Sequence, residues 1–246
     1  PAYYEDTDLA FRVRAKGKRV FYQPHAVVVH FEGQSSGTDV TQGVKRHQVI
    51  NQKTFAERWR AQLSAHRVNG LSPRLEQDRG ARRRVLVIDA CMLTPDQDAG
   101  SLRMLEILGV MRNLGCKVTF VASNLEYRLP YVRDIQALGV EVLHHPYATS
   151  ISAVIEQGAG EYEVVILSRA TVAVQYVDLV REKMPRAKLI FDTVDLHFLR
   201  ESRRADLSGD EAHRKSAQAM QATELDIIAK SDVTLVVSDF EQKLLE

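Results

Sequence analysis

The chain has 246 residues, of which 45% are hydrophobic, so it can bury one or two sizeable cores. Its formal net charge is +1, with charges of both signs interspersed, which argues against a nucleic-acid-binding surface. No apolar run approaches the roughly 20 residues that span a bilayer, and the two cysteines lack metal-ligand or redox spacing, which indicates buried thiols in a reducing cytoplasm.

The first thirty residues carry a set of chemical groups in a fixed order. Three carboxylates, Glu5, Asp6 and Asp8, precede a helical pattern that a glycine ends. Two extended runs follow on either side of Pro24, and His30 closes the second run. A strand that ends on a histidine can present this side chain to a cleft.

This run resembles the end of the catalytic domain of family 2 glycosyltransferases, which are inverting enzymes of the GT-A type. The resemblance implies transfer of a sugar from a nucleotide-diphosphate donor to an acceptor hydroxyl, with Asp6 as general base and Glu5 and Asp8 beside it. A positioned base typically contributes about 10²–10⁴ in rate. His30 would be a ligand of the Mg²⁺ or Mn²⁺ on the diphosphate. A second interpretation is an acidic helix N-terminus, where carboxylates interact favourably with the helix dipole.

The resemblance implies that the nucleotide-binding half of the GT-A domain precedes this chain, which therefore looks like a piece of a longer polypeptide, with little activity of its own expected. Residues 1–63 are expected to be the C-terminal part of that domain with a helical tail, in which Trp59 is a packing anchor. Residues 64–83 read as an exposed linker that ends in clustered arginines. These arginines are interpreted as solvated, or as a contact with anionic lipid head groups.

From residue 84 onward, strand and helix patterns alternate, which predicts an α/β fold with a doubly wound, parallel, Rossmann-like sheet over 84–246. Continuous apolar runs indicate strands buried on both faces. The expected strands are 85–88, 118–121, 140–143, 164–167, 189–191 and 233–237. The expected helices are 101–114, 130–138, 151–155, 173–184 and 210–230, and a capping box at 238–241 opens one more.

Polar residues follow the carboxyl ends of three of these strands, where ligands bind in such sheets. Gly100 would let the backbone approach a phosphate or a sugar, and Ser101 would cap a helix whose free N–H groups favour an anion. The other candidates come after the strands at 164–167 and 189–191: Arg169, Asp192, Asp195, His197 and Arg200.

No G-x-G-x-x-G opens the first helix, which disfavours an NAD-binding role. The segment from Arg84 resembles instead the N-terminal, acceptor-side domain of GT-B glycosyltransferases of the family 4 type. The likeness lies in residues 95–100, 114–119, 191–197 and 232–238. It implies a domain that needs no cofactor, with donor or acceptor contacts at Gly100, Ser101, Arg169, Asp192 and Arg200, and with Asp195 and His197 facing the sugar. From the residues alone, His197 can also be an ordinary loop histidine bonded to Asp195, and Arg169 a partner for a helix end or for Asp192.

Together, the two resemblances predict a fragment of a bifunctional glycosyltransferase that uses nucleotide-sugar donors and a glycan or lipid-linked acceptor. The expected role is synthesis of a surface polysaccharide or O-antigen in the cytoplasm, at the inner face of a membrane, without a nucleic-acid partner. Two other classes remain open: a non-catalytic scaffold that binds a glycan or a partner, and another sugar-nucleotide-binding enzyme such as an epimerase.

Overall fold

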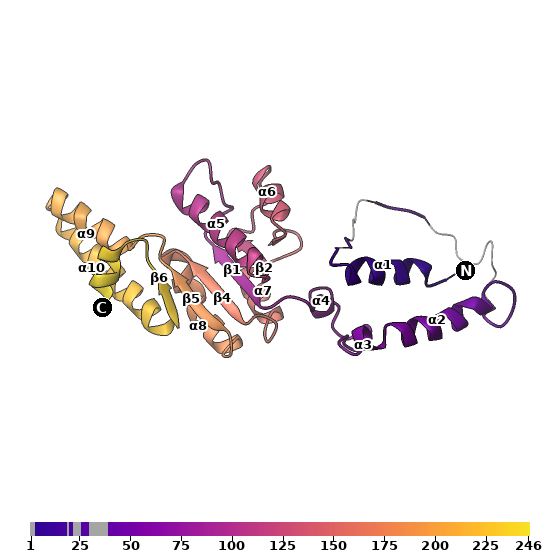
Figure 1. Cartoon of the computed structure of the whole chain (residues 1–246). Coiled ribbons are helices and arrows are strands. Elements are labelled where there is room, and N and C mark those ends of the chain that lie inside the picture. The colour runs from indigo at the N-terminus through magenta and orange to yellow at the C-terminus, as the bar shows by residue number, and fades with distance from the viewer. Residues whose placement is uncertain (1–2, 19, 22–25, 30–38) are drawn as a thin grey trace. The chain divides into compact units, whose positions relative to one another are not determined.

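A computed structural model describes residues 3–18, 20–21, 26–29 and 39–246. It divides the chain into two compact units, Pro1–Gln77 and Asp78–Glu246 (Figure 1). The division falls within the segment that the sequence predicts to be a linker. Within the described residues, we find no helix that is both long enough and apolar enough to cross a membrane.

The first unit is built from short helices around a small aromatic cluster. Its described helices are α1 (Glu5–Ala15), α2 (Arg46–Arg58), α3 (Arg60–Leu63) and α4 (Pro73–Glu76). The ring of Phe11 lies 5.0 Å from that of Phe55 and 5.3 Å from that of Trp59. Phe55 and Trp59 are buried, so Trp59 packs as the sequence predicted.

The two extended runs expected after α1 do not form strands in the described residues 20–21 and 26–29. Val27, Val28 and Val29 are 72–86% exposed. A strand is stable only when a neighbouring strand satisfies its backbone groups, and the described part of the first unit contains no other strand. The prediction of strands was therefore wrong for these residues.

The second unit is a six-stranded, fully parallel sheet, as predicted. Its strands are β1 (Arg84–Asp89), β2 (Lys117–Ala122), β3 (Glu141–Leu143), β4 (Val164–Ser168), β5 (Lys188–Asp192) and β6 (Val233–Leu235). They lie in the order β3-β2-β1-β4-β5-β6. The connecting helices are α5 (Ala99–Asn113), α6 (Tyr131–Ala137), α7 (Ile151–Gln157), α8 (Ala170–Lys183), α9 (His197–Ser208), α10 (Glu211–Lys230) and α11 (Asp239–Leu245).

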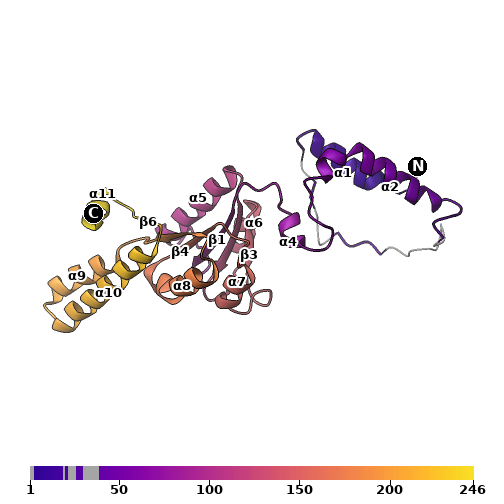
Figure 2. The same cartoon turned by 90° about the horizontal axis from the view of Figure 1, so that it is seen from below.

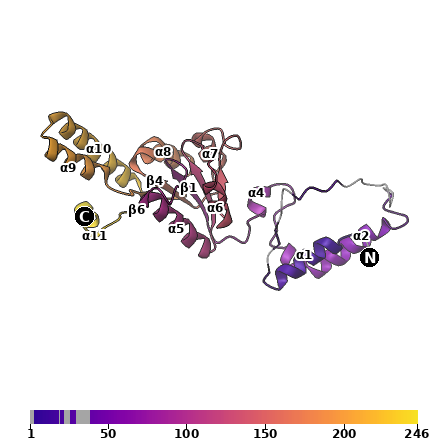
Figure 3. The same cartoon turned by 90° about the horizontal axis from the view of Figure 1, so that it is seen from above.

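Helices cover both faces of this sheet and create two cores. Helices α5 and α6 lie on one side and α7 and α8 on the other, as Figures 2 and 3 show from below and above. Along β1, Val87 packs into the first core with Met104, whereas Ile88 packs into the second with Val177. Successive side chains of β1 thus point to opposite faces of the sheet. Because both faces are buried, every residue of the run is apolar.

Helix α9 is the one element of this unit that the sequence analysis did not expect. Only Phe198 and Ala205 are buried along it, and most of its residues are polar or charged. Its N-terminus is held by a residue distant in sequence, because the buried carboxylate of Glu224 on α10 accepts the backbone N–H groups of His197 and Phe198 at 3.0 and 2.8 Å. Gly209, at φ 66°, then ends the helix.

Candidate functional site

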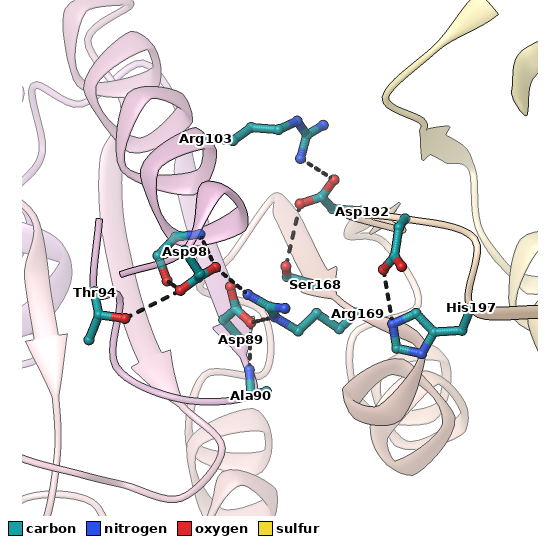
Figure 4. A network of polar contacts seen from close by, with 11 residues as sticks. Asp89, Ala90, Thr94, Asp98, Arg103, Ser168, Arg169, Asp192 and His197 are labelled. Carbon is teal, nitrogen blue, oxygen red and sulfur yellow. Dashed lines mark hydrogen bonds and ion pairs between the residues drawn. The ribbon is translucent and has the colours of Figure 1, made fainter. Parts of the chain in front are cut away.

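The candidate site lies at the carboxyl ends of β1, β4 and β5. The strand order reverses between β1 and β4, because the chain continues outward in opposite directions from these two strands. Ligands in open α/β sheets bind at such a switch point. The register sets Ser168 beside Asp192, and Asp89 ends the adjacent strand β1 (Figure 4). Charged residues from three strands therefore meet at this edge.

Arg169 is paired with the carboxylate that ends β1. Its Nε lies 2.9 Å from Oδ1 of Asp89, which is only 1% exposed (Figure 4). Burial raises the pKa of Asp89, and the guanidinium of Arg169 and the N–H of Ala90 oppose this shift. Among the described residues, Oδ2 of Asp89 has no hydrogen-bond partner. The carboxylate of Asp89 is thus buried within the site and held mainly through its other oxygen, Oδ1.

The same arginine reaches the N-terminus of α5. Its Nη2 lies 3.4 Å from Oδ1 of Asp98, which also accepts the backbone N–H of Ser101 at 2.8 Å. Burial raises the pKa of Asp98, but the hydrogen bonds from Ser101 and the charge of Arg169 outweigh it and lower that pKa. Asp98 is therefore the N-cap residue. The prediction that Ser101 caps this helix was wrong, because Ser101 is the residue whose N–H is capped.

Gly100 lies where two strained residues converge. A β-carbon added at Gly100 would lie 2.9 Å from Cγ1 of Val194, 3.0 Å from Nη2 of Arg169 and 3.2 Å from Oδ1 of Asp98. Arg169 has φ 74° and Val194 has φ 63°, a region that residues with a β-carbon rarely adopt. Strain of this kind persists only where surrounding contacts enforce it, and it concentrates at functional sites.

A second buried ion pair supports this edge from α5. Nη1 of Arg103 lies 2.6 Å from Oδ1 of Asp192, which is fully buried. The hydroxyl of Ser168 lies 3.4 Å from the other oxygen of Asp192. Sequence reasoning missed Arg103, because its partner Asp192 lies 89 positions away and no local pattern signals the pair.

Beyond β5, Asp195 bridges a histidine and an arginine. Its Oδ1 lies 3.2 Å from Nε2 of His197, and its Oδ2 lies 2.7 Å from Nη1 of Arg200. The bond to Asp195 is the one expected for a loop histidine, but His197 begins α9 and does not lie in a loop. Glu224, which fixes the start of this helix, has its pKa raised by burial.

The predicted residues of the second unit differ in how far a ligand can reach them. Ser101 and Asp192 are fully buried, so they can only position other groups. Five others are at least partly exposed: Gly100, Arg169, Asp195, His197 and Arg200. The structure pairs Arg169 with Asp89 and a helix end, and it pairs Asp192 with Arg103.

The acidic motif of the first unit is not assembled into a cation site. Asp8 accepts hydrogen bonds from Trp59 at 2.8 Å and from Arg58 at 2.9 Å, which makes it a structural residue. Asp6 is exposed and bonded to Thr7, and Glu5 is also exposed. His30 lies outside the described residues. Among the described residues, no group of three or more His, Cys, Asp and Glu side chains could hold a metal ion.

No protein-family model and no curated protein matches this chain. Several solved structures, including AibC and a lactate dehydrogenase, are similar to part of it. The crystal structure of AibC is 21% identical, over 45% of this chain and 29% of that chain, with a TM-score of 0.31. The lactate dehydrogenase of Cryptosporidium parvum is 20% identical, over 52% of this chain and 40% of that chain, with a TM-score of 0.30. The matches span less than half of either protein, and likeness at this level carries no argument about function.

Proposed function

We propose that residues 84–246 form the acceptor-side domain of a GT-B-type glycosyltransferase, and that residues 1–63 are the end of a GT-A domain in the same bifunctional protein. It would transfer sugars from nucleotide-sugar donors to a glycan or lipid-linked acceptor at the inner face of a membrane. The observation that supports this proposal best is the polar corner at the switch point, where Arg169 joins Asp89 to Asp98 beside Gly100.

The charges of this corner favour a ligand with hydroxyl groups. Three carboxylates, Asp89, Asp98 and Asp192, face two guanidinium groups, those of Arg103 and Arg169. The carboxylate of Asp98 already occupies the N-terminus of α5, where a phosphate would otherwise bind. A donor diphosphate would meet this negative charge, whereas an acceptor hydroxyl could donate to the carboxylate of Asp98, whose side chain is partly exposed. We therefore assign the corner to the acceptor.

The pair of Asp195 and His197 would face the reacting sugar. Asp195 pairs with the imidazole Nε2 of His197, and Glu224 accepts the backbone N–H of the same residue. The imidazole therefore has a defined orientation toward a ligand. In the GT-A part, the exposed carboxylate of Asp6 would accept the proton of the acceptor hydroxyl as its oxygen attacks the anomeric carbon of the donor, whose bond to the diphosphate breaks and releases the nucleoside diphosphate.

The test is a transfer assay on the full-length polypeptide that contains this chain, with a panel of nucleotide sugars, with and without Mn²⁺. We expect Asp6→Asn to abolish one transfer and His197→Ala to impair the other, each by about 10²-fold or more. Asp39→Asn and His213→Ala are the matched controls, because both residues lie outside the proposed sites.

Full sugar incorporation by both site variants would show that the site assignments are wrong. Failure of the unmodified protein to use any donor, with glycan binding retained, would favour the non-catalytic scaffold instead.

A further inference from the structure

A groove of about 720 Å³ lies beside α9, and Asp195 is one of its lining residues. Its walls come from one face of α9 and from the first turn of α11. Residues 199, 203 and 207 are spaced by four positions, so they lie on the same face of the helix. The volume is within the range of ligand-binding sites, which is about 300–1,000 Å³.

The groove has an excess of positive charge. Three arginines and two acids line it. Asp195 pairs with Arg200 and His197, and Glu241 accepts the backbone N–H of Val237 at 3.0 Å. Arg203 and Arg204 also line the groove, and within the described part of the chain neither has an ion-pair partner. Two guanidinium groups are thus available to an anion.

Exposed apolar side chains lie beside these arginines. Leu207 is 91% exposed and Phe240 is 59% exposed, and both line the groove together with Leu199. A free anion needs no such surface, and an apolar ligand needs no arginines. The combination suits a molecule that carries a negative head group and a hydrocarbon chain.

We propose that this groove binds an anionic lipid. The head group pairs with Arg203 and Arg204, and the hydrocarbon packs against Leu207 and Phe240. Charge complementarity selects this occupant, since an acidic head group supplies the partners that the two arginines lack. The inference rests on the proposed location at a membrane face, but its readout is lipid binding and requires no donor, so it can fail independently of glycosyl transfer.

The experiment measures binding of the protein to phosphatidylcholine vesicles with and without about one-third phosphatidylglycerol, at low salt and with inorganic phosphate as competitor. We expect binding only to the anionic vesicles. Because each arginine near an anionic surface changes affinity about fivefold, R203Q/R204Q should weaken binding about 25-fold. L207S removes an exposed apolar contact without touching a core residue and should weaken binding further.

The control R133Q/R186Q removes the same charge from exposed sites outside the groove and leaves the cluster at 79–84 unchanged. It should bind almost as well as the unmodified protein. The proposal is overturned if this control weakens binding as much as R203Q/R204Q does, or if no anionic vesicle binds. It is also overturned if inorganic phosphate displaces the vesicles while L207S has no effect, since the site would then bind a free anion.

Discussion

At the scale of single residues, position within a motif does not decide what a carboxylate does. Asp6 and Asp8 are two positions apart, yet Asp6 is exposed while Asp8 is held by Arg58 and Trp59. These partners come from residues 46–63, and the spacing of residues within the motif does not predict them. Asp89 is the complementary case, because the strand ending at residue 89 is predictable but the guanidinium that approaches it comes from residue 169.

The environment of Asp8 gives a pH dependence that can be measured. The hydrogen bond from Trp59, with the hydrogen bond and charge of Arg58, lowers the pKa of Asp8, against a smaller opposing effect of burial. The folded pKa lies below the unfolded value of about 3.9, so the stabilisation is present above that value and is lost as the pH falls through the folded pKa. Fluorescence of Trp59, the one tryptophan of the chain, should report this loss between about pH 5 and about pH 2. In Asp8→Asn this transition should disappear, and an unchanged midpoint would contradict the assignment.

At the scale of elements, continuous apolar runs predicted every strand of the second unit, whereas the few apolar residues of α9 left that helix unpredicted. The strands carry uninterrupted apolar runs that only a doubly covered sheet can bury. Helix α9 depends instead on packing against α10 and on capping by Glu224. Its start at residue 197 is therefore a tertiary contact, which a pattern of neighbours along the chain does not contain.

The N-terminus of α5 provides a paired test within one helix. In Gly100→Ala, the new β-carbon would lie 2.9 Å from Val194 and 3.0 Å from Arg169, so these side chains must shift. We expect a loss of about 1–3 kcal/mol in the free energy of unfolding. Gly109→Ala is the control, because nothing lies within 4 Å of its β-carbon position. It should stabilise the helix by up to about 1 kcal/mol.

Urea denaturation followed by circular dichroism measures both variants. Equal effects of the two substitutions would show that Gly100 is not required for the close approach of Val194 and Arg169.

At the scale of the whole molecule, the two units differ in how much apolar surface they bury. In the described part of the first unit, Phe55 and Trp59 are the buried hydrophobic residues, whereas the second unit has two extensive cores. Burial of apolar surface is the main stabilising contribution, and small units are correspondingly marginal.

We therefore expect unfolding in two steps. Fluorescence of Trp59 should change at a lower urea concentration than the far-ultraviolet circular dichroism, which the second unit dominates. Phe11→Ala, which removes a ring packed on Trp59, should move the fluorescence transition alone. Coincident transitions in the unmodified protein would show that the chain unfolds as one cooperative unit.

The amino-acid sequence by itself determined the α/β class, the parallel sheet, nearly every element of the second unit and the edge at which polar residues gather. These follow from local hydrophobic patterns, from the glycine, proline and capping residues at the ends of elements, and from the rules of strand connection. Only the tertiary structure decided which charges pair. It joined Asp89 to Arg169 and Asp192 to Arg103, made Asp98 the cap of α5, and left Arg203 and Arg204 without ion-pair partners among the described residues. Such pairings join residues as many as 89 positions apart, and they are fixed by how helices dock on the sheet, which no local pattern encodes.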